Sequence, residues 1–583
     1  MPGSTDRLPD SRGLNLFTAD RGFAGLLGLY LEPRLWEHLA PAFHRLGALA
    51  GDALDRDALI ADKHPPQLRH RTRAGEDRQS IEKHPAYRRL EEIAFGEYGL
   101  AAMSHRGGVL GWPERLPPAV KYGLSYLYVQ AEFGLCCPLS MTDAAARTIG
   151  RFADPALAAR YLPGLTAQDL DQLTQGAMFM TEQNAGSDVG ATGTIAVRTT
   201  ETDGIGAATA WRLHGEKWFC SNPDAGVALV LARPEGAPSG TKGLALFLLP
   251  AQLADGSPNH YRIVRLKEKL GTRSMASGEI RMDGALAYLV GAADQGFTQM
   301  TDMINMSRLS NGMRAAGLMR RALTEALYFA RRRNAFGRPI IEMPLMRRQL
   351  LKMMLPTEAA RSMMLFAAIE LEAADGGDED ARRAVRLLTP LVKFRACRDA
   401  RRVTGDAMEV RGGCGYIEEW SDARLVRDSH LGSIWEGTSN IVATDVVRAI
   451  RREGALEALL PRLKAMAASV PLDSMRASLE QAIERTVALA MTATDPSNIH
   501  LARQSATGLY YACAATVLAH EGTRLGNSGD ARRLLLASLA IEQRLTPRDP
   551  LAAQSYGRED ALAEALLSEE PVTMTRIGTI IGG

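Results

Sequence analysis

The segment at residues 180–189, MTEQNAGSDV, combines residue types that suit contact with a polar ligand. Its glycine and serine let a ligand approach the backbone closely, and the hydroxyls of Thr181 and Ser187 can bond a phosphate or a polar ring. A loop that only caps a neighbouring element explains the same residues. This segment alone therefore does not identify a site.

Two further segments carry side chains that can contact or act on a ligand. GEKWFCSN at 215–222 has two adjacent aromatics beside Ser221 and Asn222, although aromatics at a strand end more often pack into a core. SIWEGTSNI at 433–441 places Glu436 just before a predicted helix, for which Thr438 is a candidate N-cap. A carboxylate at a helix entrance is often only a favourable charge at the helix dipole. Each segment is weak evidence when taken alone.

The composition describes the kind of chain that positions these segments. Its 583 residues are too many for one hydrophobic core and predict roughly three or four structural units. Apolar residues make up 46% and charged residues 23%, which excludes a disordered or fibrous chain. The net charge of +2 gives no reason in itself to expect a nucleic-acid or membrane partner.

The sequence also leads to expectations about the cellular compartment of the protein and about metal binding. No apolar run approaches the length of a membrane span, and the first residues, MPGSTDRLPDSRG, lack the pattern of a secretory signal. We therefore expect a cytoplasmic protein with no membrane partner. The cysteines have no CxxC spacing, so we expect reduced thiols and no metal site. They are Cys136, Cys137, Cys220, Cys397, Cys414 and Cys513.

The hydrophobic pattern changes twice along the chain. A polar, basic stretch from Asp62 to Arg89 is expected to be an exposed loop leading into a helix, and helical periodicity follows over 90–165. From about Met178 short apolar or alternating runs, separated by turn residues, predict an antiparallel sandwich or barrel. These runs lie at 194–199, 211–215, 227–232 and 244–249.

After Gly296 the helical pattern returns and continues. The apolar stripe predicts a long helix over about 297–334, of a length that suits a helix bundle. Three more helices are predicted at about 345–375, 379–409 and 438–455, and beyond Leu459 a region rich in Ala and Leu predicts further helices.

In this order, the three segments resemble motifs of the acyl-CoA dehydrogenase family. The likeness includes NMSR at 305–308, RNAFG at 333–337 and EVRGGCGY at 409–416, so it runs from about residue 85 to 455. KEKLGTRSMAS at 267–277, the pair Trp218 and Phe219, and the extension past 450 are similar to the AidB group of that family, which is linked to the response to DNA alkylation.

The resemblance implies an α+β multidomain protein with the acyl-CoA dehydrogenase fold. We expect an N-terminal helical domain at 1–175, a central antiparallel β-barrel or sandwich at 176–292, a C-terminal four-helix bundle at 293–455 and a helical C-terminal extension at 456–583. Arg333 and Phe336 would reach the cofactor of a neighbouring subunit, so the resemblance implies a homotetramer.

FAD is the cofactor that the resemblance implies, with acyl-CoA as the substrate and an electron-transfer flavoprotein or a similar acceptor as the redox partner. Arg308 is carried over as a substrate-binding residue. The positions that match the family's FAD contacts come from all parts of the likeness. They are Met180, Thr181, Gly186, Ser187, Phe219, Ser221, Arg333, Phe336, Gly412, Gly413, Thr438 and Asn440.

Glu436 falls where the family's catalytic base stands. Removal of the α-hydrogen of a thioester as a proton needs a carboxylate over the α-carbon, while the β-hydrogen leaves as a hydride to flavin N5. Some family members carry the base on the first bundle helix, at the position of Ser307. Serine cannot do this unaided, so Glu436 is the candidate base for α,β-dehydrogenation.

Two positions depart from the family pattern. Glu409 stands where the family usually has Gln before the glycine pair, and its charge could repel a cofactor phosphate unless Arg411 or another cation compensates. The segment at 287–297 lacks the Val-Pro that the family often shows, so CoA binding along that edge is not assumed.

The alternative function is double-stranded DNA binding in an alkylation response, with weak or vestigial dehydrogenase activity. Basic residues outnumber acidic ones ten to two over 314–352 and eight to one over 382–402, which can form a phosphate-binding stripe. Cofactor phosphate, subunit salt bridges and solvated helix faces explain the same clusters. The resemblance places DNA contacts in the extension, where Arg532 and Arg533 are candidates, yet 446–583 holds 15 basic and 15 acidic residues.

Overall fold

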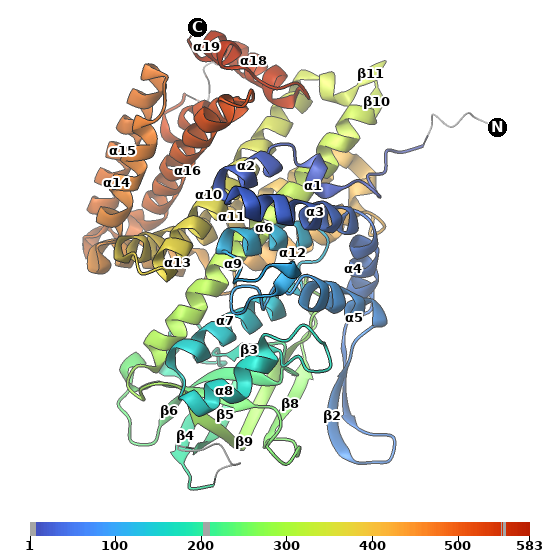
Figure 1. Cartoon of the computed structure of the whole chain (residues 1–583), viewed down its shortest axis with the longest axis vertical. Helices are drawn as coiled ribbons and strands as arrows, with labels where there is room; N and C mark the ends of the chain where they lie inside the picture. The colour runs from blue at the N-terminus through green and yellow to red at the C-terminus, as the bar shows by residue number, and fades with distance from the viewer. Residues whose placement is uncertain (1–6, 202–209, 550, 552–555, 583) are drawn as a thin grey trace, which may run out of the picture. The chain divides into compact units, whose positions relative to one another are not determined.

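The computed structural model describes residues 7–201, 210–549, 551 and 556–582 (Figure 1). These residues form two compact units, each built from several stretches of the chain. Unit 1 contains Met1–Asp52, Pro118–Ala131 and Arg308–Gly583, and unit 2 contains Ala53–Pro117 and Glu132–Ser307. The expected domain boundaries at 175, 292 and 455 stay predictions.

The N-terminal part of unit 1 is helical. Aromatic side chains hold it together, since Phe23 packs against Phe43 and Tyr126 with ring centroids 6.2 and 4.8 Å away. Such aromatic pairs add to the free energy of apolar burial. The helices are α1 (Leu16–Ala19), α2 (Phe23–Tyr30), α3 (Pro33–Ala50) and α6 (Pro118–Tyr128).

The four predicted long helices of the bundle are confirmed. They are α9 (Gly296–Arg332), α10 (Pro344–Asp375), α11 (Glu379–Arg411) and α13 (Ser439–Glu453). A short hairpin of β10 (Asn334–Ala335) and β11 (Arg338–Pro339) follows α9.

One helix of unit 1, α12 (Ser421–Gly432), was not predicted from the sequence. Its buried residues include Asp422, Arg424 and Arg427, so an apolar stripe does not mark its inner face. Ion pairs such as Asp422 with Arg411 hold that face instead.

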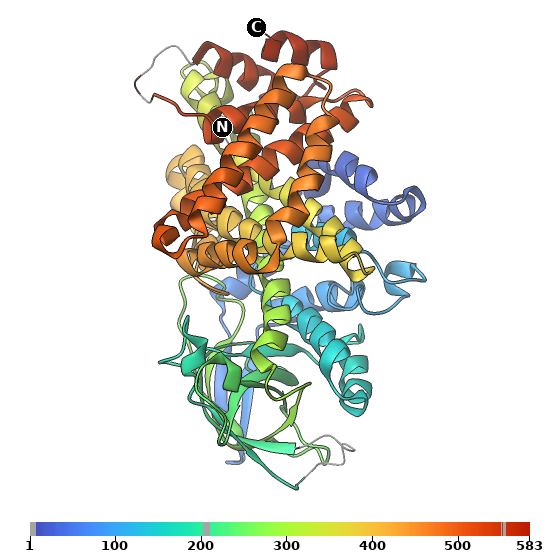
Figure 2. The same cartoon turned by 90° about the vertical axis from the view of Figure 1, so that its left-hand side faces the viewer.

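The extension after α13 is helical, as predicted. In Figures 1 and 2 α14, α15 and α16 lie side by side, and α16 also contacts α10 and α13. The α-helices are α14 (Ala455–Ala468), α15 (Asp473–Ala493), α16 (Ala502–Gly526), α17 (Arg532–Ala540), α18 (Tyr556–Leu567) and α19 (Met574–Gly582).

Unit 2 begins with helices and a hairpin where a loop was expected. β1 (Gln67–Arg71) pairs with β2 (Asp77–Glu82), so the prediction of a loop within 62–89 is wrong, although the segment is mostly exposed and leads into a helix as expected. Both strands are mostly exposed and polar, and they lack the alternation that identifies a half-buried strand. The helices of unit 2 are α4 (Ala53–Lys63), α5 (Pro85–Glu91), α7 (Cys136–Phe152) and α8 (Pro155–Leu165).

The central β-domain is a closed sheet. Its strands follow the order β3-β6-β4-β5-β9-β7, and β7 pairs back onto β6. The strands are β3 (Gly176–Phe179), β4 (Ile195–Arg198), β5 (Ala210–Ser221), β6 (Val227–Pro234), β7 (Ala245–Pro250), β8 (Tyr261–Leu266) and β9 (Ser277–Leu289). Closure leaves fewer unpaired strand edges.

The sheet is mixed rather than purely antiparallel as expected. β6 pairs in parallel with both β3 and β4, whereas its pairing with β7 is antiparallel. Parallel neighbours need a long crossover connection, and the chain between β3 and β6 supplies one through β4 and β5.

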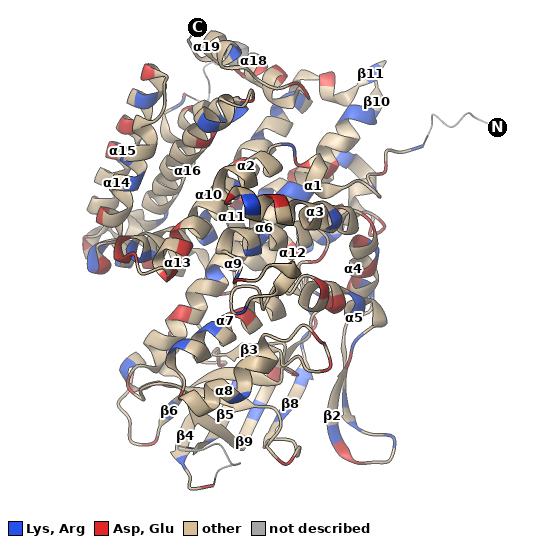
Figure 3. Ribbon diagram, in the orientation of Figure 1, with Lys and Arg blue, Asp and Glu red and all other residues tan. Residues whose placement is uncertain are grey.

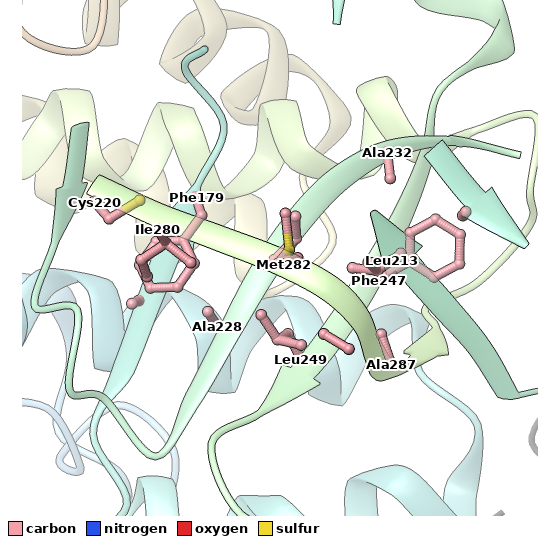
Figure 4. Close-up of a cluster of buried hydrophobic side chains, with 14 of the residues drawn as sticks. Phe179, Leu213, Cys220, Ala228, Ala232, Phe247, Leu249, Ile280, Met282 and Ala287 are labelled. Atoms are coloured by element: carbon pink, nitrogen blue, oxygen red, sulfur yellow. The ribbon is translucent and has the colours of Figure 1, made fainter. Parts of the chain in front are cut away.

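The core of this domain is a cluster of inward-facing side chains. Phe179, Leu213, Phe247 and Ile280 are at most 1% exposed and come from four different strands (Figure 4). This packing fixes the end of β3, where the first candidate segment begins.

The structure also bears on the expectations about membrane spans, metal sites and cysteines. Among the described residues, none of the helices is long and apolar enough to cross a membrane. The part of the chain that the structure describes also holds no group of His, Cys, Asp and Glu that could bind a metal. None of the six cysteines, all of which lie in the described residues, forms a disulfide, and five are buried.

Candidate functional site

The first candidate segment leaves the sheet at the end of β3. The backbone nitrogen of Trp218 donates a hydrogen bond to the Thr181 carbonyl at 2.8 Å, which places the 180–187 turn beside the end of β5. The second candidate segment lies on that part of β5. Met180, Thr181 and Ser221 are half-buried there, while Ser187 is exposed. The fold of unit 2 therefore brings the two segments together.

A buried ion pair anchors this turn. Lys217, whose side chain has no exposed surface, lies 2.7 Å from Glu182 Oε1 and also donates to the Leu231 carbonyl. Burial lowers the pKa of Lys217. Burial also pushes the pKa of Glu182 up, but Lys217 and the hydrogen bonds from Thr194 and Gly193 outweigh it, so that pKa lies below its usual value. Glu182 is thus a structural carboxylate.

The surface beside the turn is open to a flat ligand. Phe219 is 58% exposed, and a Cβ placed on Gly186 would meet no atom within 4 Å. Lys267 lies 3.9 Å from the Trp218 ring centroid and 4.8 Å from that of Phe219. An exposed aromatic, a cation and uncovered backbone thus share one face of unit 2.

In unit 1, Glu436 sits in an unusual backbone conformation just before α13. Its φ is 55°, and that of Gly437 is 101°. A Cβ on Gly437 would lie 3.3 Å from Ile441 and Val442, so only glycine fits there without strain. Thr438 occupies the N-cap position as expected, but its side chain makes no capping hydrogen bond. Asn440 is exposed and lies 3.5 Å from Arg503 through its Oδ1 atom.

Two buried cations hold the carbonyls of this strained turn. Arg308 Nε donates to the Glu436 carbonyl at 3.0 Å, and Lys393 Nζ donates to the Gly437 carbonyl. Asp445 fixes Arg308 at 2.7 Å. Burial lowers the pKa of Lys393 to about 8; Cys397 opposes this shift, Arg308 lowers the pKa further, and Glu436 raises it.

The remaining predicted cofactor contacts of unit 1 lie on exposed turns. Arg333 is exposed, and Phe336, at the tip of the β10–β11 hairpin, is 95% exposed with a φ of 52°. Gly412 and Gly413 follow α11, and a Cβ on either would meet nothing within 4 Å. Both stretches therefore offer uncovered surface.

Glu409 stands where the family usually has Gln before Gly412 and Gly413. Arg411 does not compensate the charge of its carboxylate. Arg411 is buried in ion pairs with Glu325 and Asp422. Glu409 instead accepts a hydrogen bond from Gln349 Nε2 at 3.1 Å.

The predicted site residues thus form two groups, one in each unit. The sequence analysis did not identify Lys393 and Lys217. Lys393 donates a hydrogen bond to the turn at Gly437, and Lys217 donates one to Glu182 in the first candidate segment. Lys393 could have been noticed as a lone lysine in the apolar run LLTPLVKF at 387–394, since a lysine at a buried helix position needs a polar partner. Lys217 stands beside aromatics and gave no comparable signal.

Comparison with known proteins agrees with this architecture. The family descriptions that match are "Adaptive response protein AidB N-terminal domain" over residues 7–172, "Acyl-CoA dehydrogenase, middle domain" over 177–285 and "Acyl-CoA dehydrogenase, C-terminal domain" over 294–451.

Two curated relatives share much of the sequence. "Putative acyl-CoA dehydrogenase AidB" of Escherichia coli is 35% identical over 441 residues, which are 73% of this chain and 76% of the relative. "Acyl-CoA dehydrogenase family member 11" of Caenorhabditis elegans is 30% identical over 453 residues, 75% of this chain and 71% of the relative.

Among solved structures, Caenorhabditis elegans ACDH-11 in complex with C11-CoA matches with a TM-score of 0.85 and 26% identity, covering 94% of both chains. With matching descriptions that span most of the chain and a relative 35% identical over 73% of it, this chain belongs to the acyl-CoA dehydrogenase family and resembles its AidB branch.

Proposed function

We propose that this protein is an FAD-dependent dehydrogenase that converts an acyl-CoA thioester to its α,β-unsaturated product, with Glu436 as the base. The observation that carries the proposal is the turn at Glu436, whose left-handed backbone is held by Arg308 and Lys393. A non-glycine residue in such a conformation costs free energy, and the conformation persists only where the surrounding structure enforces it. Arg308 of α9 and Lys393 of α11 hold this backbone, and in this way they position the Glu436 carboxylate.

FAD fits the residues present. Unit 2 offers the exposed Phe219 ring and the uncovered Gly186 backbone, and unit 1 offers the open backbone of Gly412 and Gly413. When bound, the flavin supplies the acceptor for a hydride from the substrate β-carbon.

The protein's own groups account for the other half of the reaction. Glu436 takes the α-proton, and Arg308 and Lys393 keep its backbone in place. Arg308 also remains the proposed substrate-binding residue. The related ACDH-11 structure contains C11-CoA, which supports an acyl-CoA as the substrate class.

The deciding experiment replaces the base. Glu436→Gln keeps the side-chain shape, so FAD should stay bound while anaerobic flavin bleaching by a panel of acyl-CoAs falls by roughly 10²–10⁴-fold. Glu419→Gln, a change at an exposed glutamate before α12, is the matched control and should bleach normally. Unchanged bleaching in Glu436→Gln would assign the base to another residue.

The expected homotetramer and an electron-transfer flavoprotein as acceptor belong to the same proposal. Phe336 is 95% exposed on a hairpin tip beside Arg333, which leaves its ring accessible to a neighbouring subunit, as this part of the proposal requires.

DNA binding is the second candidate function. The observation that favours it is a surface hollow of about 420 Å³ lined by Arg382, Arg383, Arg386 and Arg452. However, Arg386 is paired with Asp445 and Glu453, and Arg382 and Arg383 are near Glu379. Such partners reduce the charge available to a phosphate backbone.

The extension gives DNA binding less support than the resemblance implies. Arg533, named above as a DNA contact, is 3% exposed and pairs with Glu358 and Glu521, so it is not available to DNA. Figure 3 shows basic and acidic residues interspersed along α14 and α15.

A salt titration tests DNA binding directly. Affinity for a DNA duplex should fall by about 0.9 log units per log unit of salt for each phosphate neutralised. The double change Arg382→Glu with Arg383→Glu should then abolish binding, whereas a flat salt dependence would reject this function.

A further inference from the structure

Unit 1 contains a cavity of about 520 Å³ that shares no lining residue with the proposed dehydrogenase site. Its walls come from the N-terminal helices α1 and α2, from α9 and α10, and from α17 and α18 of the extension. The volume lies within the range of about 300–1,000 Å³ that small-molecule sites occupy. Glu436, Gly412, Arg333 and Phe336 do not line it.

The charge of this cavity is strongly positive. Seven arginines and four carboxylates line it, an excess of three positive charges when all are ionised. Leu327, Met354, Leu536 and Leu566 supply apolar wall between the charged groups. The lining therefore combines cations with surface that suits an organic body.

The deep part of the cavity is a buried ion-pair network. Asp20 and Glu358 are each contacted by Arg320 and Arg361, and Arg533 pairs with Glu358 at 2.8 Å. All three arginine side chains are at most 7% exposed. Arg361 Nε is buried and has no hydrogen-bond acceptor among the described residues. The deep charges thus pair mainly with one another.

The outer part holds cations that the protein's carboxylates do not balance. Arg21 and Arg331 share one carboxylate, Glu569, at 3.7 and 3.6 Å. Burial lowers the pKa of Arg331, and Arg21, Arg332 and Arg320 lower it further against the opposing effect of Glu569. These arginines repel one another, and a bound anion would relieve that repulsion.

Arg332 is the cation best placed to bind such an anion. It lies 3.8 Å from the Tyr328 ring centroid and donates to the Tyr328 carbonyl. Within the described part of the chain it pairs with no carboxylate, and it is exposed. Its guanidinium fork is therefore available at the cavity mouth.

We propose that this cavity binds a small organic phosphate about the size of a nucleoside diphosphate. Arginine forks match the geometry of phosphate oxygens and bind them bidentately, and the leucine and methionine walls provide contact for the organic part. The site is formed jointly by the N-terminal helices and the extension, so occupancy would tie the two ends of the chain together.

The test is isothermal titration of the FAD-loaded full chain with ADP, and separately with inorganic pyrophosphate. ADP should bind, and Arg332→Ala should weaken it about tenfold or more, since charge-assisted hydrogen bonds are lost. Arg332→Lys should lose less. Arg262→Ala, a change at an exposed arginine of β8 that lines neither hollow, is the matched control and should leave ADP affinity unchanged.

Several results would overturn the proposal. One is the absence of any heat of binding up to about 10 mM ADP. A second is equal loss of affinity in Arg332→Ala and Arg262→Ala. A third is ADP binding that is unchanged in Arg332→Ala, which would place ADP at another site. Binding of pyrophosphate without ADP would also reject an organic ligand.

A second measurement locates the ligand. Hydrogen exchange should show that ADP protects the backbone around 18–25 and 525–536 in the wild type but not in Arg332→Ala. Protection confined to other segments would contradict the site. Neither readout depends on dehydrogenase activity, so failure of the proposed function leaves this test intact.

Discussion

Arg308 Nε and the main-chain carbonyl of Glu436 are joined by a hydrogen bond of 3.0 Å between the long helix α9 and the turn before α13. The same guanidinium binds Asp445 of α13 at 2.7 Å. One arginine therefore sets the distance between two elements that are 128 residues apart in the chain.

Replacing Arg308 tests this coupling. Arg308→Gln should slow flavin reduction by acyl-CoA while FAD remains bound, because the Glu436 backbone loses its donor; the stability cost should be about 1–3 kcal/mol. Arg386→Gln removes the other arginine on Asp445 but keeps the bond to Glu436. Stopped-flow flavin absorbance should show normal reduction in that control, and equal slowing in both variants would assign the effect to Asp445.

Lys393 makes stability depend on pH in the alkaline range. Its pKa falls from 10.5 to about 8 on folding, mainly through burial. Below about pH 8 the lysine is charged in both the folded and the unfolded state, and burial of its charge costs free energy. As the pH rises towards 10.5, the folded state releases its proton before the unfolded state does, so the native state gains stability.

The thermal midpoint of the wild type minus that of Lys393→Met should therefore increase from about pH 8 to about pH 10. Lys464→Met, at an exposed lysine of α14, should show no such trend. A constant difference for Lys393→Met would mean that the lysine is not buried in solution.

Gly437 should tolerate no side chain. Gly437→Ala places a Cβ at a φ of 101° and 3.3 Å from two side chains, which should cost about 1–3 kcal/mol and displace Glu436. Gly405→Ala in α11, where a Cβ meets nothing within 4 Å, should be neutral or stabilise by up to about 1 kcal/mol. Urea unfolding measures both, and equal effects would argue against strain at Gly437.

Lys217 should be essential for the stability of the β-domain. Lys217→Met leaves the Glu182 carboxylate without its cation and should cost about 3 kcal/mol or more. Adding Glu182→Gln removes the uncompensated charge and should restore part of the loss. Lys242→Met, at an exposed lysine, should change nothing in the same urea unfolding experiment. Failure of the double variant to recover stability would show that Lys217 acts through other contacts.

Phe336 tests the proposed contact between subunits. Phe336→Ser should weaken FAD binding and reduce the tetramer fraction in analytical ultracentrifugation, because the 95% exposed ring is proposed to reach a neighbour. Ile499→Ser changes another exposed apolar residue, 44% exposed, and should affect neither. A tetramer with unchanged FAD affinity in Phe336→Ser would remove this residue from the interface.

The sequence alone determined the features that repeat locally. The long helices α9, α10, α11 and α13 were predicted within a few residues, because a buried helix face imposes an apolar period that can be counted. The short apolar strands and the candidate turn at Glu436 were likewise visible, since residue type and order identify them.

Only the tertiary structure decided which distant residues support each turn. Lys393 holds Gly437 and Lys217 holds Glu182 across gaps of 44 and 35 residues, and no local pattern encodes such pairs. The polar hairpin β1–β2 escaped prediction because its exposed strands lack apolar alternation, and helix α12 because charged residues occupy its inner face. They are held by hydrogen bonds and charges between segments, whereas sequence patterns report mainly apolar burial.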